Sequence, residues 1–338
     1  MLNNAFIISI ILSLFCIYIF VNKRLLISKY LKVIDSPKKN KIHNVNTPLI
    51  GSYAIVVSIL IILCIFDFQQ KKEMILIFVS SIAFFIVGYF DDRYGINAYI
   101  KLIIFILILS LLFNQTDIFI IKKLYFQSID VDIVLNNHLR NFVSILCILL
   151  FVNALNLFDG INGLASGFSG LCILFLSIIS SGQLSMIFFT ISLLILINTY
   201  FIIKGNFFLG DSGTLFFGSL ISLITIYVYN DLSINYFVIP VEQIFILFMI
   251  PGFDMFRLFI IRIKNKKDPF IGDLDHLHHK LLTKFGLNKT LSIFFLLFLI
   301  TNFFSYFEIL NKSYIIFIYL IIYIFLISFF KKKLKNSS

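Results

Sequence analysis

The sequence MILIFVSSIAFFIVGYFDD, residues 74–92, is a long apolar run that ends in two adjacent carboxylates, Asp91 and Asp92. No Asp, Glu, Lys or Arg occurs between residues 74 and 90, and a helix needs about 20 mostly apolar residues to cross a bilayer. A charge within a span costs about 2.5–3.5 kcal/mol on insertion scales, so such residues are usually functional or paired. The run therefore predicts a membrane-spanning helix with an acidic pair at its end.

Runs of this kind recur along the chain. Of its 338 residues, 60% are hydrophobic and 13% are charged, whereas about 25% charged residues is usual in a soluble domain. We find eleven apolar runs, which start near Phe6, Leu49, Met74, Ala98, Asn141, Leu164, Leu184, Gly213, Phe237, Leu291 and Tyr314. The runs are too long for the alternating strands of a β-barrel. The sequence predicts an all-α polytopic membrane protein with about eleven transmembrane helices.

The basic residues predict how these helices are oriented. If the N-terminus lies outside, 22 of the 28 Lys and Arg residues fall in the loops and the tail on the other side. Basic loops mark the cytoplasmic side, so we expect the N-terminus outside and the C-terminus in the cytoplasm. The net charge of +11 follows from this topology and from attraction to anionic lipid. It does not indicate a nucleic-acid partner.

The unusual polar clusters all fall on the predicted cytoplasmic side. No internal repeat, long linker or second domain is evident in the sequence. We therefore expect residues 1–338 to form a single transmembrane catalytic domain. Its active-site loops are predicted at residues 23–48, 91–97, 157–163, 203–213 and 262–289.

The first cluster joins Asp91 and Asp92 to Lys101, which opens the next apolar run ten residues further on. A helical hairpin would return this lysine to the side of the carboxylates. Carboxylate oxygens suit Mg²⁺, and a lysine suits phosphate. The cluster indicates a magnesium–phosphate site, although a solvated loop that caps two helices would show the same residues.

The second cluster repeats a polar residue at every third position, namely Asn153, Asn156, Asp159 and Asn162. On a straight α-helix these side chains would spread over half the cylinder, and a 3₁₀ turn would align them. Glycines at 160 and 163 permit a break at the end of the span. The amides and the carboxylate are suited to a ribose, a nucleobase or a metal, although Asn and Gly also join helices in membranes.

The third cluster is Gly210-Asp211-Ser212-Gly213, which opens the eighth apolar run. A helix N-terminus offers free N–H groups and the positive end of the helix dipole, which favour phosphate. We expect Asp211 to hold a metal. Asp and Ser are also common helix caps, so a purely structural role remains open, above all for Ser212.

The fourth cluster places three histidines, His276, His278 and His279, in the long basic loop. Imidazolium groups that contact phosphate are the favoured interpretation. A zinc site is disfavoured because the spacing is not that of a helical His-Glu-x-x-His motif and no cysteine is near. A solvated loop remains an alternative for His278.

Together these clusters resemble the polyprenyl-phosphate N-acetylhexosamine-1-phosphate transferases. The resemblance covers most of the chain in order, through Asp35-Ser-Pro37, Lys41-Ile-His43, Thr47-Pro48, Gly51, Gly88-x-x-Asp91-Asp92, Lys101, Asn153-x-x-Asn156-x-x-Asp159-Gly160, Leu209-Gly210-Asp211, Pro251-x-x-Asp254, Arg257, Arg262 and residues 269–279. A single motif of this kind is weak evidence, whereas the ordered set is strong. The resemblance implies a multi-pass protein of the bacterial cytoplasmic (inner) membrane whose active site faces the cytoplasm.

The resemblance also implies roles for individual residues. Catalytic roles are implied for Asp91, Asp92, Asp159, His276 and His279. Substrate binding is implied for Lys101, Asn153, Asn156, Asn162, Phe208, His278, His43 and Lys41, with Phe208 stacked on the uracil. Mg²⁺, for which Mn²⁺ would substitute, is expected on Asp211 together with Asn162.

The expected reaction transfers N-acetylhexosamine-1-phosphate, in the first place GlcNAc-1-phosphate, from a UDP-sugar to undecaprenyl phosphate with release of UMP. Such a reaction starts the synthesis of a cell-envelope polysaccharide. Asn162 stands where many bacterial members have Asp, Asn40 where Arg is usual and Ser52 where a second Gly is usual, which bears on specificity. Another UDP-N-acetyl sugar (a 6-deoxy-N-acetylhexosamine or MurNAc-pentapeptide), a covalent two-step route and a homodimer stay open. A secondary transporter is the alternative of a different class.

Overall fold

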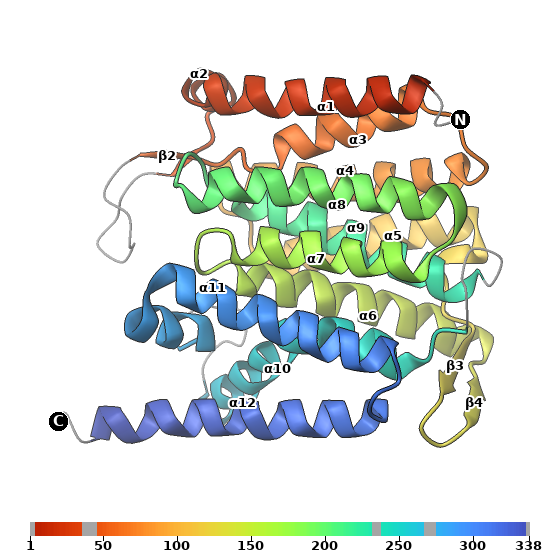
Figure 1. The fold of residues 1–338 in the computed structure, drawn as a ribbon, viewed down its shortest axis with the longest axis vertical. Coiled ribbons are helices and arrows are strands. Elements are labelled where there is room, and N and C mark those ends of the chain that lie inside the picture. Colours follow the sequence, from red (N-terminus) through yellow and green to blue (C-terminus); the bar gives the residue numbers. More distant parts are fainter. Residues whose placement is uncertain (1–3, 36–45, 232–237, 267–274, 336–338) are drawn as a thin grey trace. The chain divides into compact units, whose positions relative to one another are not determined.

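The computed structural model describes residues 4–35, 46–231, 238–266 and 275–335, which contain twelve α-helices (Figure 1). Nine of these helices are long and apolar enough to cross a membrane, and two more, Tyr53–Ile65 and Leu164–Ile179, are shorter and apolar. Each of the eleven predicted runs falls in its own helix. The prediction of an all-α polytopic membrane protein is thus confirmed in kind, while the number of spans and their orientation stay predictions.

The chain packs as two compact units, residues 1–121 with 137–238 and residues 122–136 with 239–338. The first unit contains α1 (Asn4–Asn22), α2 (Arg24–Leu31), β1 (Ile34–Asp35), β2 (Thr47–Pro48), α3 (Tyr53–Ile65), α4 (Lys71–Tyr94), α5 (Ala98–Gln115), η1 (Asp117–Phe119), α6 (Asn137–Phe158), α7 (Leu164–Ile179), α8 (Gly182–Ile203) and α9 (Gly210–Asn230). The second contains β3 (Lys123–Phe126), β4 (Val131–Val134), α10 (Val241–Lys264), α11 (Leu277–Tyr306) and α12 (Lys312–Lys335). This division concerns packing, and the single catalytic domain stays a prediction.

Helix α9 is the core of the first unit. Every residue from Ser212 to Tyr229 is buried, and α9 packs against α4, α6 and α7. Small residues let the backbones approach, because a Cβ on Gly88 would lie 2.5 Å from Ser212 Cα and one on Gly218 would lie 2.9 Å from Val152 Cα. Close contact at small residues is the usual way in which membrane helices associate. The packing therefore fixes the end of α4 against the start of α9.

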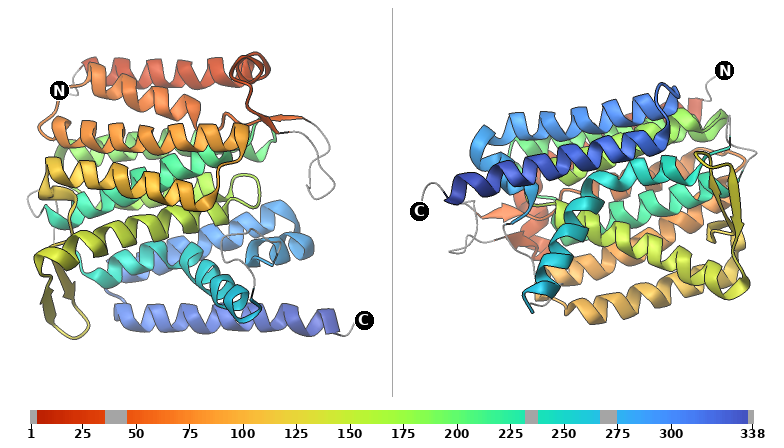
Figure 2. Two further views of the ribbon diagram at one scale, coloured as in Figure 1. Left: turned by 180° about the vertical axis from the view of Figure 1, so that it is seen from behind. Right: turned by 90° about the horizontal axis from the view of Figure 1, so that it is seen from below.

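The second unit joins three helices to a two-stranded hairpin. Strands β3 and β4 pair antiparallel, with Lys123 opposite Val134. The turn of the hairpin lies beside the N-terminal end of α10 (Figure 2). There the Glu242 carboxylate accepts hydrogen bonds from the backbone N–H groups of Gln127 at 3.2 Å and Ser128 at 2.9 Å. A segment that lies between α5 and α6 in the sequence thereby becomes part of this unit.

Several predicted loops are shorter in the structure than the sequence suggested. Asp91 and Asp92 lie in the last turn of α4, which continues to Tyr94. The loop predicted at 262–289 is wrong over much of its length, because α10 runs to Lys264 and α11 starts at Leu277. Helix α11 contains a kink at Gly286, where φ is 75°. The segment is polar enough to resemble a loop, yet it forms helical turns before the apolar run begins.

Candidate functional site

The first side-chain cluster lies in the first unit, where α4 ends and α9 begins. The Lys101 ammonium contacts the Asp91 carboxylate directly and lies 3.8 Å from Asp211 Oδ2. The other oxygen of Asp91 accepts a hydrogen bond of 2.6 Å from the backbone N–H of Ile96, just beyond α4. The hairpin of α4 and α5 therefore returns Lys101 to the acidic pair, as the sequence predicted.

Asp92 makes different contacts from its neighbour Asp91. Its Oδ1 accepts a hydrogen bond of 2.8 Å from the backbone N–H of Asp211, and its Oδ2 accepts one of 3.0 Å from that of Ser212. The residue that caps the first turn of α9 therefore comes from another helix. The expectation that these N–H groups await a phosphate is wrong for Asp211 and Ser212. Asp92 holds the Asp211 backbone, which is a positioning role.

Glycine is required where Asp92 meets α9. Gly210 has φ of 73°, a left-handed conformation that side chains disfavour. A Cβ at this position would lie 2.8 Å from Asp92 Oδ2. The Gly210-Asp211 pair thus serves two purposes: the glycine admits the Asp92 carboxylate, and the next residue presents its own carboxylate to Lys101.

The backbone of Phe208 is held by two hydrogen bonds. Its N–H donates to the Pro48 carbonyl at 2.8 Å, and its carbonyl accepts from the Gly51 N–H at 2.9 Å. The Gly51 carbonyl in turn accepts a hydrogen bond from the Asn198 amide. The Phe208 side chain is half-buried. Stacking of this ring on a uracil stays a prediction.

The four polar residues of the second cluster divide between a helix and a turn. Asn153 and Asn156 lie in the last turns of α6, which ends at Phe158, and Asp159 and Asn162 lie in the turn that follows. This turn ends at Gly163, whose φ is 84°. All four side chains are half-buried. The break at glycine was predicted, and the arrangement is neither a straight α-helix nor a 3₁₀ turn.

Asn156 is the member of this cluster that reaches Asp211. Its Nδ2 donates to Asp211 Oδ1 at 2.9 Å and to Thr214 Oγ1 at 2.8 Å. The structure brings Asn156, rather than Asn162, to Asp211. Metal binding by Asn162 stays a prediction without a contact that supports it in the described residues.

Asp159 lies just beyond the end of α6. Burial, with a further contribution from the negative charge of Asp92, raises the pKa of Asp159 to about 7. The family resemblance implied a catalytic carboxylate here, and the structure adds that burial favours its neutral form.

The donor set of this cluster fits a hard divalent cation. The Asp91 and Asp211 carboxylates share one lysine, Lys101, and the charge of Asp91 acts on Asp92 and that of Asp92 on Asp159, so carboxylates outnumber basic groups here. The Asp91 and Asp211 carboxylates lie next to each other, an arrangement that a cation would stabilise. Carboxylate and amide oxygens are the ligands that Mg²⁺ prefers.

The histidines form a second cluster, in the second unit. His276 and His278 are 4% and 1% exposed, and their rings stack at 5.0 Å between centroids. His279 is half-buried and its ring lies 4.4 Å from that of His278. The solvated-loop interpretation of His278 is therefore wrong, because residues 277–279 form the buried first turn of α11.

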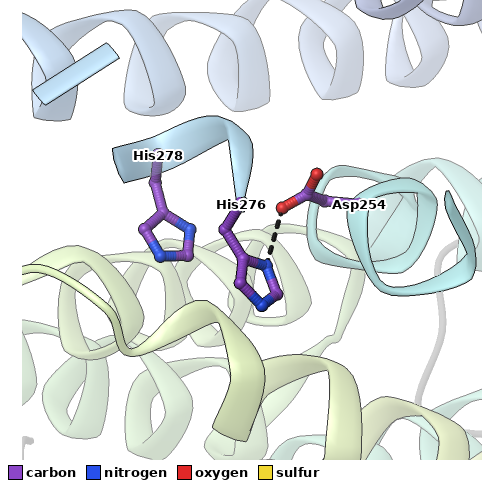
Figure 3. Close-up of side chains that lie close together, drawn as sticks. All are labelled: Asp254, His276 and His278. Atoms are coloured by element: carbon purple, nitrogen blue, oxygen red, sulfur yellow. Dashed lines mark hydrogen bonds and ion pairs between the residues drawn. The ribbon is translucent and has the colours of Figure 1, made fainter. Parts of the chain in front are cut away.

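Asp254 of α10 lies beside these histidines (Figure 3). Its Oδ2 is 2.9 Å from His276 Nδ1, and Asp254, His276 and His278 each offer a ligand atom within 4.8 Å of the others. Sequence reasoning gave Asp254 no role. A signal was present, since an acid in the middle of an apolar run is usually paired or functional.

Two predicted substrate-binding residues, Lys41 and His43, lie outside the described residues. The same holds for the first part of the predicted histidine loop, residues 267–274. Their roles stay predictions.

Comparison with known proteins gives a family match over the first cluster and several relatives of the chain. Residues 74–229, which include Asp91 through Asp211, match the model of Glycosyl transferase family 4. The chain is 28% identical to a Bacillus subtilis protein named a probable undecaprenyl-phosphate N-acetylglucosaminyl 1-phosphate transferase, over 88% of this chain and 82% of the relative. It is 27% identical to the undecaprenyl-phosphate alpha-N-acetylglucosaminyl 1-phosphate transferase of Thermotoga maritima, over 87% of each chain. The relative of that name in Escherichia coli K12 is 25% identical, over 76% of this chain and 71% of the relative. The first cluster therefore lies within a segment that is similar to glycosyl transferase family 4.

Proposed function

We propose that this protein transfers GlcNAc-1-phosphate from UDP-GlcNAc to undecaprenyl phosphate at the cytoplasmic face of a bacterial membrane. The observation that carries the proposal is the cluster of Asp91, Lys101, Asn156 and Asp211 at the meeting point of α4, α6 and α9. Excess carboxylates beside a lysine are suited to binding a metal-bound diphosphate. The names of the relatives favour this reaction over a transporter.

In the proposed reaction an oxygen of the lipid phosphate attacks the sugar-bearing phosphorus of the nucleotide sugar. The bond from that phosphorus to the bridging oxygen of UMP breaks, and UMP leaves. A phosphate monoester has a second pKa of about 6, so the acceptor is largely dianionic at pH 7. No strong general base is needed, and the main task of the site is to bring two anions together.

The residues of the chain divide this task. Asp211 would hold Mg²⁺, with Asp91 beside it, and the ion when bound would supply positive charge to the diphosphate. Asn156 holds the Asp211 carboxylate through its amide N–H. Lys101 supplies a fixed positive charge next to the same carboxylates. Asp92 holds the Asp211 backbone in place through the two N–H groups at the start of α9.

Transfer of radiolabel in washed membranes tests the proposal. UDP-[¹⁴C]GlcNAc, undecaprenyl phosphate and Mg²⁺ are supplied, and label in the organic phase is counted with and without EDTA and added UMP. We expect labelled lipid that EDTA prevents and UMP reverses. Label from a different UDP-N-acetyl sugar would correct the donor. The absence of label from every UDP-sugar, in membranes shown to contain the protein, would refute the transferase.

A further inference from the structure

The Asp254 carboxylate in the middle of α10 is 4% exposed and is surrounded by hydrogen-bond donors. Oδ1 accepts from Arg257 Nη2 at 2.8 Å, from Arg257 Nε at 3.2 Å and from the Tyr323 hydroxyl at 2.7 Å. Oδ2 lies 2.9 Å from His276 Nδ1 and accepts from the Leu277 backbone N–H at 3.1 Å. A carboxylate offers about four lone-pair sites, so these five contacts saturate it.

These contacts fix the turn that precedes α11. Arg257 Nη2 also donates to the Asp275 carbonyl at 2.7 Å, while Asp254 binds the N–H of Leu277. The backbone is thus held on both sides of His276, and the His276 ring is held through Nδ1. Tyr323 joins α12 to the same group, because its hydroxyl also accepts from Arg257 Nε at 2.8 Å.

The saturation of Asp254 argues against a metal in this cluster. A metal bound by Asp254, His276 and His278 would have to displace a partner of Asp254. Arg257 places a positive charge 2.8 Å from the same carboxylate. This charge would repel a metal ion bound there. A carboxylate oxygen that accepts a hydrogen bond from histidine Nδ1–H instead fixes the tautomer and the orientation of the ring. Nε2 is then left to contact a different group. In the described residues, no hydrogen bond to His276 Nε2 is seen.

We propose that Asp254 is a positioning residue, which holds His276 with Nδ1 protonated and Nε2 presented to a phosphate oxygen of the substrates, and that Tyr323 supports it. This inference rests on the proposed transferase function and extends it, since it states how one histidine of the second unit is prepared for phosphate. In the Ser-His-Asp triad, an aspartate likewise orients the catalytic histidine without contacting the substrate.

The decisive variants are Asp254→Asn, His276→Ala and the double variant, compared as purified protein in the transfer reaction. Loss of ring orientation should lower kcat by on the order of 10²-fold, with KM for UDP-GlcNAc changed little, as expected for a contact made in the transition state. The double variant should be no slower than His276→Ala, because Asp254 acts through His276. Losses that multiply would overturn the inference.

A second pair of variants covers the case in which Asp254→Asn does not fold. Tyr323→Phe removes one hydrogen bond to Asp254 and keeps the ring, and we expect a loss of about 2- to 10-fold in kcat, which corresponds to about 0.4–1.4 kcal/mol. Tyr319→Phe is the matched control: this residue lies one turn earlier on α12, is 3% exposed and stacks on Phe253, and among the described residues the tyrosine hydroxyl that donates to Asp254 is that of Tyr323. Equal activity of the two variants would count against the inference.

Two measurements do not depend on turnover. In ¹⁵N-histidine-labelled protein in lipid, the His276 signal, assigned by its loss in His276→Ala, should show a protonated Nδ1 in the wild type and lose this preference in Asp254→Asn. An unprotonated Nδ1 in the wild type, or one zinc per chain in the purified protein, would overturn the inference. An inactive wild type with a protonated Nδ1 would instead refute the transferase function and leave the positioning contact in place.

Discussion

The carboxylates of the adjacent residues Asp91 and Asp92 bind different partners. Asp91 is paired with Lys101, whereas both oxygens of Asp92 bind backbone N–H groups of α9. Asp92→Asn keeps one acceptor oxygen and loses the charge and the second acceptor. We therefore expect it to weaken both folding and turnover, by about 1–2 kcal/mol in the free energy of unfolding.

Asp211→Ala tests the carboxylate itself. The Asp211 side chain is 40% exposed and contributes little buried apolar surface, so the variant should insert and stay monodisperse. It should lose turnover by on the order of 10³-fold or more, since the proposed cation site loses a charged ligand. Near-wild-type transfer of label in this variant would remove Asp211 from the site.

The raised pKa of the Asp159 carboxyl predicts that the stability of the protein depends on pH. Its folded-state pKa is raised to about 7 from the ordinary 3.8, so the folded state binds the proton more tightly than the unfolded state does. Stability is then lost as the pH rises from about 4 to 7. In EDTA at pH 8, Asp159→Asn should melt a few degrees above the wild type, which corresponds to a free energy of unfolding higher by on the order of 1–2 kcal/mol. This difference in melting temperature should shrink toward pH 5. An advantage that is constant with pH would contradict this origin.

The residue scale also shows the limit of sequence reasoning. The pairing of Lys101 with the carboxylates followed from counting spans, because a hairpin returns its second helix to the same side. That Asp92 caps α9 did not follow, since the partner lies 119 residues away. The bond from Asn156 to Asp211 likewise depends on how α6 packs on α9, which the periodicity of one helix does not contain.

At the scale of the elements, the contact between α4 and α9 depends on glycine. A Cβ on Gly88 would lie 2.6 Å or less from backbone atoms of Asp211 and Ser212, which cannot move without disturbing the site. We expect Gly88→Ala to destabilise the protein by more than about 2 kcal/mol and to reduce activity with it. Gly252→Ala is the control, because nothing lies within 4 Å of a Cβ there, and its melting temperature should be unchanged or higher. Equal melting temperatures for the two variants would contradict the close packing of α4 on α9.

Helices were easier to predict than their ends. Each apolar run has its helix, because hydrocarbon requires every backbone group to be paired internally. The ends depend on local polar contacts that hydropathy does not report. The start of α11 is the clearest case: a polar segment with three histidines forms a helical turn because Asp254 and Arg257 hold its first residues.

At the scale of the whole molecule, the orientation of the chain in the membrane is a prediction that can be tested directly. We expect a fluorescent protein fused after residue 338 to fold in the cytoplasm. A cysteine placed at Asp130 in the hairpin turn, in a background without the native cysteines, should react with a membrane-impermeant maleimide from outside. Labelling of this cysteine only after the membrane is opened would reverse the topology inferred from the basic residues.

The hairpin of β3 and β4 also has a consequence for synthesis. Its turn residue Gln127 binds Glu242, 115 residues later, and Lys312, 185 residues later. At about 5–20 residues per second, the ribosome needs about 6–23 s to make the first partner after the hairpin and longer for the second. In the predicted orientation, the hairpin crosses the membrane before these partners are made, and a nascent chain that stops before α10 leaves it without them.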